Sequence, residues 1–92
     1  MTPATARALG VLHDYGPLRP REFARRMWPE SDGWRRSCRC GPNGSHRGGG
    51  MYLAAGGYLG ALTRRGLVQR YGRGAYILSD AGLAALARDR QA

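Results

Sequence analysis

Arginine is the residue type in this chain that is best suited to chemistry with a ligand. The 92 residues include fifteen basic ones, all of them arginine, against six acidic ones, which gives a formal net charge of +9. A guanidinium group binds a phosphate or the edge of a guanine through paired hydrogen bonds. Such a charge on one small domain indicates a polyanionic partner, and nucleic acid is the partner expected.

Basic and aromatic side chains gather between residues 30 and 50. They are Trp34, Arg35, Arg36, Arg39, His46 and Arg47. Guanidinium groups near an aromatic ring suit contacts with phosphates and stacking on bases. We expect Trp34 to be buried and to pin this segment to the body of the domain; if exposed, it would offer a surface for stacking or for a partner.

Three glycines, Gly48, Gly49 and Gly50, follow His46 and Arg47 and precede a predicted helix. The N–H groups and the positive dipole at a helix N-terminus attract phosphate, so this junction is a candidate phosphate site. A flexible hinge is the alternative role for the glycines. The Lys-Ser or Lys-Thr that completes a nucleotide-binding loop does not follow them.

Cys38, Cys40 and His46 are the residues that could hold a metal ion, because two thiolates and an imidazole supply three of the four ligands of a zinc site. Paired cysteines in structural zinc sites are usually separated by at least two residues, and only Arg39 separates these. We therefore expect free thiols, no metal and no cofactor. The sequence also lacks paired carboxylates in one motif and a Ser-His-Asp set, so we expect no enzymatic activity.

Two helices are predicted before this basic segment. The first begins at Pro3 behind the capping residue Thr2 and ends near Tyr15, where Gly16 and a proline follow. Its apolar side is a stripe at helical spacing. The stripe consists of Ala6, Leu9, Leu12 and, at its edge, Val11.

Leu18 is predicted to lie in a short extended link to a second helix, which Pro20 opens and Pro29 ends. One side of this helix is apolar and is expected to face the core. Its members are Phe23, Ala24 and Met27. The opposite side is basic, with Arg21, Arg25 and Arg26.

A third helix is predicted over residues 51–65, ended by Gly66. Its core-facing residues are Met51, Ala55, Tyr58, Leu59 and Leu62. Alternating residues around a Gly-Arg-Gly turn at 72–74 then predict a two-stranded hairpin, and a last helix starts near Asp80. In that helix Leu83 and Leu86 are expected in the core.

This order resembles the second half of a winged helix-turn-helix DNA-binding domain of the MarR-like transcriptional-regulator type. The resemblance rests on a leucine, two arginines and Gly-Leu-Val over residues 62–68, and on the strand and helix start over 76–82. The two earlier helices resemble the first two of that fold. The predicted fold is therefore mainly α with a small β-hairpin, one winged-helix domain over 1–92, with a structureless Gly- and Arg-rich insertion at about 30–50.

The resemblance implies that the third helix enters the major groove, yet its outward side is made of small residues. They are Ala54, Gly56, Gly57, Gly60 and Ala61. Such a face carries little code for bases, and its glycines weaken the helix, which indicates that a groove wall or a partner helix approaches its backbone. Base or sugar contacts are then expected near the helix ends, from Tyr52, Thr63 and Arg64.

Arg70 and Arg73 flank the turn of the predicted hairpin. In the family this wing lies along the minor groove or the phosphate backbone, and a tight turn projects Arg73 away from the body. The alternative is a solvated arginine without a partner.

Double-stranded DNA binding is the expected function, by a small bacterial or phage transcriptional regulator or an accessory DNA-architecture protein. The first alternative is a protein-interaction module that docks a polymerase or another large partner through the Gly and Ala face of the third helix. The second is binding to structured RNA, and a homodimer is left open. No apolar segment is long enough to span a membrane and no secretion signal is evident, so a cytoplasmic location is expected.

Overall fold

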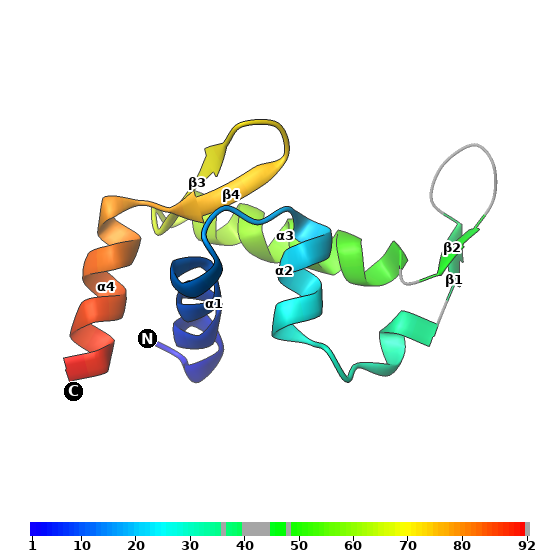
Figure 1. The fold of residues 1–92 in the computed structure, drawn as a ribbon, viewed down its shortest axis with the longest axis horizontal. Coiled ribbons are helices and arrows are strands. Elements are labelled where there is room, and N and C mark those ends of the chain that lie inside the picture. The colour runs from blue at the N-terminus through cyan, green and yellow to red at the C-terminus, as the bar shows by residue number, and fades with distance from the viewer. Residues whose placement is uncertain (36, 40–44, 48, 92) are drawn as a thin grey trace.

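The computed structural model describes residues 1–35, 37–39, 45–47 and 49–91, and Figure 1 shows their arrangement. This part of the chain is mainly helical with a small antiparallel hairpin, as the sequence predicted, and it contains a second hairpin that was not predicted. The elements are α1 (Pro3–Tyr15), α2 (Pro20–Met27), the 3-10 turn η1 (Asp32–Arg35), β1 (Ser37–Arg39), β2 (Ser45–Arg47), α3 (Gly49–Arg64), β3 (Val68–Tyr71), β4 (Ala75–Leu78) and α4 (Asp80–Gln91). Among the described helices, none has the length and apolarity needed to cross a membrane.

The ends of α1 follow directly from its sequence. The Thr2 hydroxyl accepts a hydrogen bond of 3.2 Å from the N–H of Thr5, and Gly16 ends the helix with φ of +74°, a conformation that favours glycine. The buried stripe is Thr5, Ala8, Leu9 and Leu12. The predicted Ala6 is half-buried rather than buried, because the buried stripe follows spacings of four, from Thr5 to Leu9 and from Ala8 to Leu12.

Helix α2 has the predicted bounds and buries the predicted residues Phe23, Ala24 and Met27. The Phe23 ring lies 6.1 Å from the ring of Trp28 and 6.2 Å from that of Tyr58 in α3. From the other side, α3 contributes Ala55, Leu59 and Leu62 to the same core. The buried residues of α1, α2 and α3 thus form one cluster, which holds the middle of α3 against the body.

Strands β3 and β4 form the predicted hairpin, with Val68 opposite Leu78 and Tyr71 opposite Ala75. The link between α1 and α2 is extended at Leu18, as predicted, and it also pairs with β4 through an isolated antiparallel bridge to Tyr76. The hairpin is therefore attached to the body along the side of β4 that faces away from β3.

Helix α4 packs closely on the loop between α3 and β3. The Ser79 hydroxyl accepts a hydrogen bond of 3.1 Å from the N–H of Gly82, and a Cβ atom on Gly82 would overlap the carbonyl oxygen of Leu67. This approach turns Gly82 and Leu86 toward the core and leaves Leu83 45% exposed. The prediction of a buried Leu83 is wrong for that reason.

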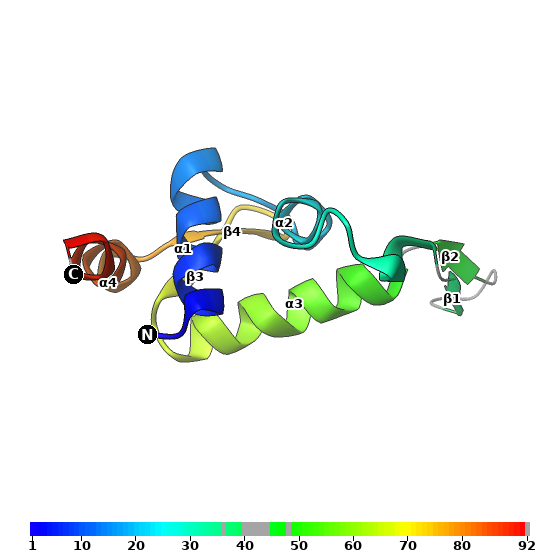
Figure 2. The same ribbon diagram turned by 90° about the horizontal axis from the view of Figure 1, so that it is seen from below.

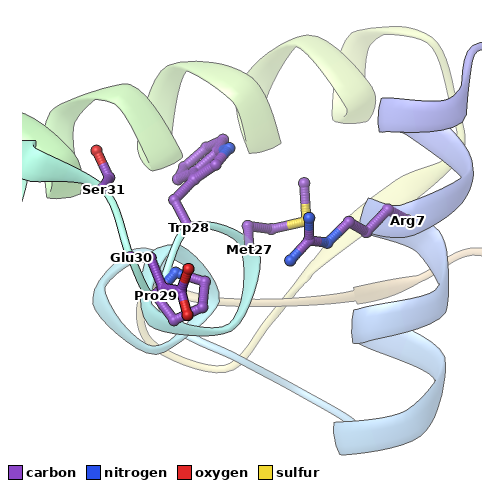
Figure 3. A pocket seen from close by; sticks show the side chains of 6 residues that line it. All are labelled: Arg7, Met27, Trp28, Pro29, Glu30 and Ser31. Carbon is purple, nitrogen blue, oxygen red and sulfur yellow. The ribbon is translucent and has the colours of Figure 1, made fainter.

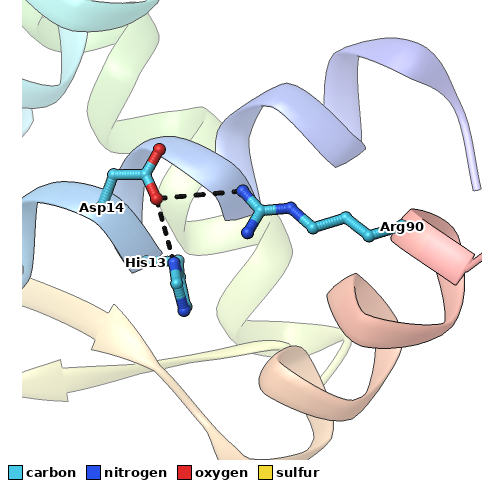
Figure 4. A network of polar contacts seen from close by, with 3 residues as sticks. All are labelled: His13, Asp14 and Arg90. Carbon is cyan, nitrogen blue, oxygen red and sulfur yellow. Dashed lines mark hydrogen bonds and ion pairs between the residues drawn. The ribbon is translucent and has the colours of Figure 1, made fainter.

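A polar contact links the ends of α1 and α4 (Figure 4). The Asp14 carboxylate lies 3.0 Å from His13 Nδ1 and 3.8 Å from Arg90 Nη2. The hydrogen bond from His13 and the charge of Arg90 lower the pKa of Asp14.

The expectation of a structureless segment between residues 30 and 50 is wrong. It contains the turn η1 and a second antiparallel hairpin, in which Ser37 pairs with Arg47 and Cys38 with His46. The sequence between these strands contains Gly-Pro-Asn-Gly at 41–44, which are turn-forming residue types. This turn signal predicts a hairpin, and the prediction from charge and composition overlooked it. Residues 36, 40–44 and 48 lie outside the described part of the chain.

Candidate nucleic-acid interface

One side of α3 is open over most of its length. Figure 2 shows that α1, α2 and the β3–β4 hairpin all lie on the other side of this helix. A Cβ atom added to Gly50, Gly56 or Gly57 would meet no other part of the described chain within 4 Å. The outward orientation predicted for Ala54, Gly56, Gly57, Gly60 and Ala61 agrees with their exposed or half-buried state. We call the side formed by Gly50, Leu53, Gly57, Gly60 and Arg64 the open face.

Two larger side chains lie on the open face. Leu53 is 66% exposed, and it shares the face with Gly57 and Gly60 through spacings of four and three. Arg64 folds back along the helix, with its Nη1 3.9 Å from the position that a Cβ atom on Gly60 would occupy. Leu53 was not among the site residues predicted from the sequence, although its helical spacing from the glycines was a usable signal.

Thr63 is half-buried near the end of α3. Its hydroxyl donates a hydrogen bond of 2.8 Å to the carbonyl oxygen of Leu59, one turn earlier. This internal bond uses the hydroxyl donor and leaves only acceptor capacity for a ligand.

Tyr52 lies on the flank of α3 rather than on the open face, because its position is one residue short of Leu53 and turned by about 100°. Its ring is 5.8 Å from the ring of Trp34, and the Arg21 guanidinium lies 5.6 Å from its centroid. Trp34 is half-buried and donates a hydrogen bond of 2.7 Å from Nε1 to the carbonyl oxygen of Trp28. The hydrogen bond attaches η1 to the body, so the prediction of a buried Trp34 is met in part, and the Arg25 guanidinium lies over the half-buried ring at 4.6 Å.

The predicted phosphate site at the start of α3 is described in part. Helix α3 begins at Gly49, two residues before the predicted start, so Gly49 and Gly50 belong to the helix; Gly49 is buried and Gly50 exposed. Arg35 ends η1 and is exposed. The backbones of Arg39, His46 and Arg47 lie in β1 and β2, next to this end of α3 (Figure 1), and the positions of their side chains, together with all of Arg36, lie outside the described structure.

The turn of the β3–β4 hairpin presents the two predicted arginines to solvent. Arg70 on β3 and Arg73 in the turn are both exposed. Gly72 and Gly74 on either side of Arg73 have φ of +60° and +74°, so the tight turn depends on both glycines.

An open pocket lies where the end of α2 faces α1 (Figure 3), with a volume of about 490 Å³. Its lining residues are Arg7, Met27, Trp28, Pro29, Glu30 and Ser31. Arg7 and Glu30 are the charged members, and the lining contains no histidine or cysteine. Across the described parts of the chain, no group of three or more histidine, cysteine or acidic side chains is placed to hold a metal ion.

Comparisons of the chain with models of known protein families, with curated proteins and with solved structures find no match. Its function is therefore inferred from the side chains described above.

Proposed function

We propose that this chain is a winged helix-turn-helix domain that binds double-stranded DNA through the open face of α3 and the β3–β4 hairpin. The order of the elements supports the winged-helix assignment: α1 and α2 come first, α3 follows after η1 and the β1–β2 hairpin, and the β3–β4 hairpin follows α3 directly. The pairing of Leu18 with Tyr76 supports it further, because it adds a short extended segment beside the hairpin.

The open face of α3 is the observation that carries the DNA-binding proposal. The helix has 16 residues and is held to the body by Ala55, Leu59 and Leu62, and on the opposite side a Cβ atom on Gly50, Gly56 or Gly57 would meet nothing within 4 Å among the described residues. The major groove of B-DNA, about 12 Å wide, admits an α-helix, and small residues allow its backbone to approach the bases. Arg64 supplies a guanidinium on this face, and Leu53 supplies an apolar group suited to a thymine methyl.

Charge supports the same partner. Arg70 and Arg73 on the hairpin are exposed, and the chain carries a net charge of +9. Phosphate neutralisation by arginines then dominates affinity, and specificity comes from the helix ends, the hairpin and DNA shape. The role is binding rather than catalysis, in a cytoplasmic transcriptional regulator or DNA-architecture protein of bacterial or phage type.

A fluorescence-anisotropy titration tests this proposal. Duplex DNA, hairpin RNA and single strands are compared at a low and at a physiological salt concentration. The proposal predicts binding to duplex DNA that weakens steeply with salt, because each neutralised phosphate releases counterions. Preference for hairpin RNA, or a flat salt dependence with duplex DNA, would contradict it.

A protein partner is the second candidate, and the exposure of Leu53 favours it. A 66% exposed leucine beside Gly57 and Gly60 suits an apolar contact with another helix. Sedimentation equilibrium of the wild type and of Leu53→Ser tests the simplest form, in which the partner is a second copy. A dimer that the substitution dissociates supports this form, and a monomer at all concentrations contradicts it.

A further inference from the structure

We infer that Arg21, Arg25, Trp34 and Tyr52 form a preorganised site for the phosphate backbone of the duplex that α3 binds, with the two aromatic rings orienting the two guanidinium groups. We call these four residues the arginine–aromatic patch. The inference rests on the proposed DNA binding and adds a site on α2 and η1 that the open face and the hairpin do not contain.

Both arginines of the patch lie on one side of α2. They are four residues apart, so their side chains neighbour each other on the helix surface, and both are exposed. Two like charges at this spacing destabilise a helix. The ion pairs within the described residues all involve Asp14, so no described carboxylate lies within ion-pair distance of Arg21 or Arg25. An external anion would relieve their repulsion.

Each guanidinium of the patch lies near an aromatic ring. The Arg25 guanidinium carbon is 4.6 Å from the centroid of Trp34, and that of Arg21 is 5.6 Å from the centroid of Tyr52. A guanidinium on a ring face keeps its N–H edge available for paired hydrogen bonds to phosphate. Because the ring already restricts the side chain, less conformational entropy is lost on binding.

The rings are themselves held in place by the body. The Trp34 Nε1–H donates to the Trp28 carbonyl at 2.7 Å, and the rings of Trp34 and Tyr52 are 5.8 Å apart. Gly33, next to Trp34, packs so closely on Met51 of α3 that a Cβ atom there would overlap the methionine sulfur. The start of the segment between α2 and α3 thus places the aromatic ring of Trp34 beside Arg25.

The position of the patch points to DNA backbone rather than to bases. Tyr52 lies on the flank of α3 that faces α2, next to the start of the open face at Gly50 and Leu53. The phosphate backbones form the walls of the major groove, so groups on the flank of an inserted helix meet phosphates. Tyr52 acts here as a positioning residue through its ring, and its hydroxyl is not needed.

Anisotropy titrations with one short duplex across a salt series test the inference. Arg25→Ala is expected to weaken binding about tenfold, the loss of one charge-assisted hydrogen bond to phosphate. It should also reduce the slope of log K against log salt by about 0.9. Arg26→Ala is the matched control, because Arg26 is an exposed arginine of the same helix stacked on a ring, that of Tyr15 at 3.9 Å, outside the patch. Its effect on affinity is expected to be less than half as large.

Variants of the aromatic residues test whether the rings orient the arginines or only support the fold. Tyr52→Phe keeps a ring and should retain affinity and slope, whereas Trp34→Leu and Tyr52→Leu keep apolar bulk without a ring and should behave like the arginine variants. In a double-mutant cycle, Trp34→Leu should add little to Arg25→Ala. Circular-dichroism melting confirms that each variant folds.

The outcomes distinguish this inference from the proposed function. Wild-type binding to the duplex with an unchanged affinity and slope in Arg21→Ala and Arg25→Ala overturns the patch alone. Equal losses in Tyr52→Phe and Tyr52→Leu overturn the orienting role of the rings. Absence of wild-type binding to duplex DNA, or binding to hairpin RNA only, overturns both.

Discussion

Leu18 and Tyr76 exchange two backbone hydrogen bonds. The Leu18 N–H donates to the Tyr76 carbonyl at 3.0 Å, and the Tyr76 N–H donates to the Leu18 carbonyl at 2.8 Å. An isolated two-stranded hairpin is marginally stable in water, so this pairing and the burial of Val68 and Leu78 hold β3 and β4 to the body. Arg73 is thereby presented from a fixed hairpin rather than from a loose loop.

Arg73→Ala is expected to lower affinity for duplexes of different sequence by a similar factor, about fivefold to tenfold, because the side chain contacts phosphate rather than bases. Its exposure means that few packing contacts are lost, so the thermal midpoint should not change. Arg88→Ala, an exposed arginine on α4, is the control for charge alone. Unchanged binding in Arg73→Ala would show that the hairpin does not touch DNA.

Deletion of residues 37–45 should leave a folded domain. The buried hydrophobic residues of the described chain fall between Ala8 and Met27 and between Ala55 and Leu86, so the deletion removes none of them. Trp34 and its bond to Trp28 also remain. Thermal unfolding followed by circular dichroism should stay cooperative, and loss of cooperativity would show that this segment supports the core.

A chelator should not change the thermal midpoint of the intact protein. The prediction rests on the single residue between Cys38 and Cys40, a spacing too short for a structural zinc site. A large fall of the midpoint on chelation, reversed by added zinc, would overturn it.

Asp14→Asn should destabilise the protein at neutral pH and have no effect in strong acid. The hydrogen bond from His13 and the charges of Arg90 and His13 lower the folded-state pKa of Asp14 below 3.8. A lowered carboxyl pKa stabilises the folded state above pH 3.8, and this contribution disappears as the pH falls through the folded-state value. Thermal midpoints of both proteins at pH 7 and pH 2 check this, and an equal difference at both would contradict it. Because Asp14 is exposed, the effect is small.

The sequence predicted those parts of the fold that depend on local signals. Helix α1 begins after Thr2 and ends before Gly16, as expected, and the spacing of Phe23, Ala24 and Met27 identified the buried side of α2. Leu83 was misplaced because its exposure depends on a tertiary contact, the approach of Gly82 to the carbonyl of Leu67, which spacing does not reveal.

The part of the candidate site that depends on local helical spacing could also be predicted from the sequence. The small residues of α3 follow helical spacing, so the outward side could be read from the sequence. The stacking of Arg25 on Trp34 brings together residues from two elements joined by a turn, and the position of that turn follows from packing on Met51. Nothing in the sequence around Trp34 specifies which arginine its ring meets.

The glycines of the open face offer the most direct test of the central proposal, that α3 approaches DNA closely along this side. A Cβ atom on Gly57 would meet nothing within 4 Å, so Gly57→Ala should raise the free energy of unfolding by up to about 1 kcal/mol while lowering affinity. Gly57→Leu, the second variant, places a large side chain on the same face. Its control is Ala84→Leu, which adds a leucine at an exposed position of α4.

The deciding measurement is the duplex affinity of Gly57→Leu, taken beside its thermal midpoint. We expect a folded protein that no longer binds duplex DNA, because the leucine side chain holds the backbone of α3 away from the groove. Normal affinity for duplex DNA in the folded Gly57→Leu variant would show that the open face does not contact DNA, and would rule out binding through α3.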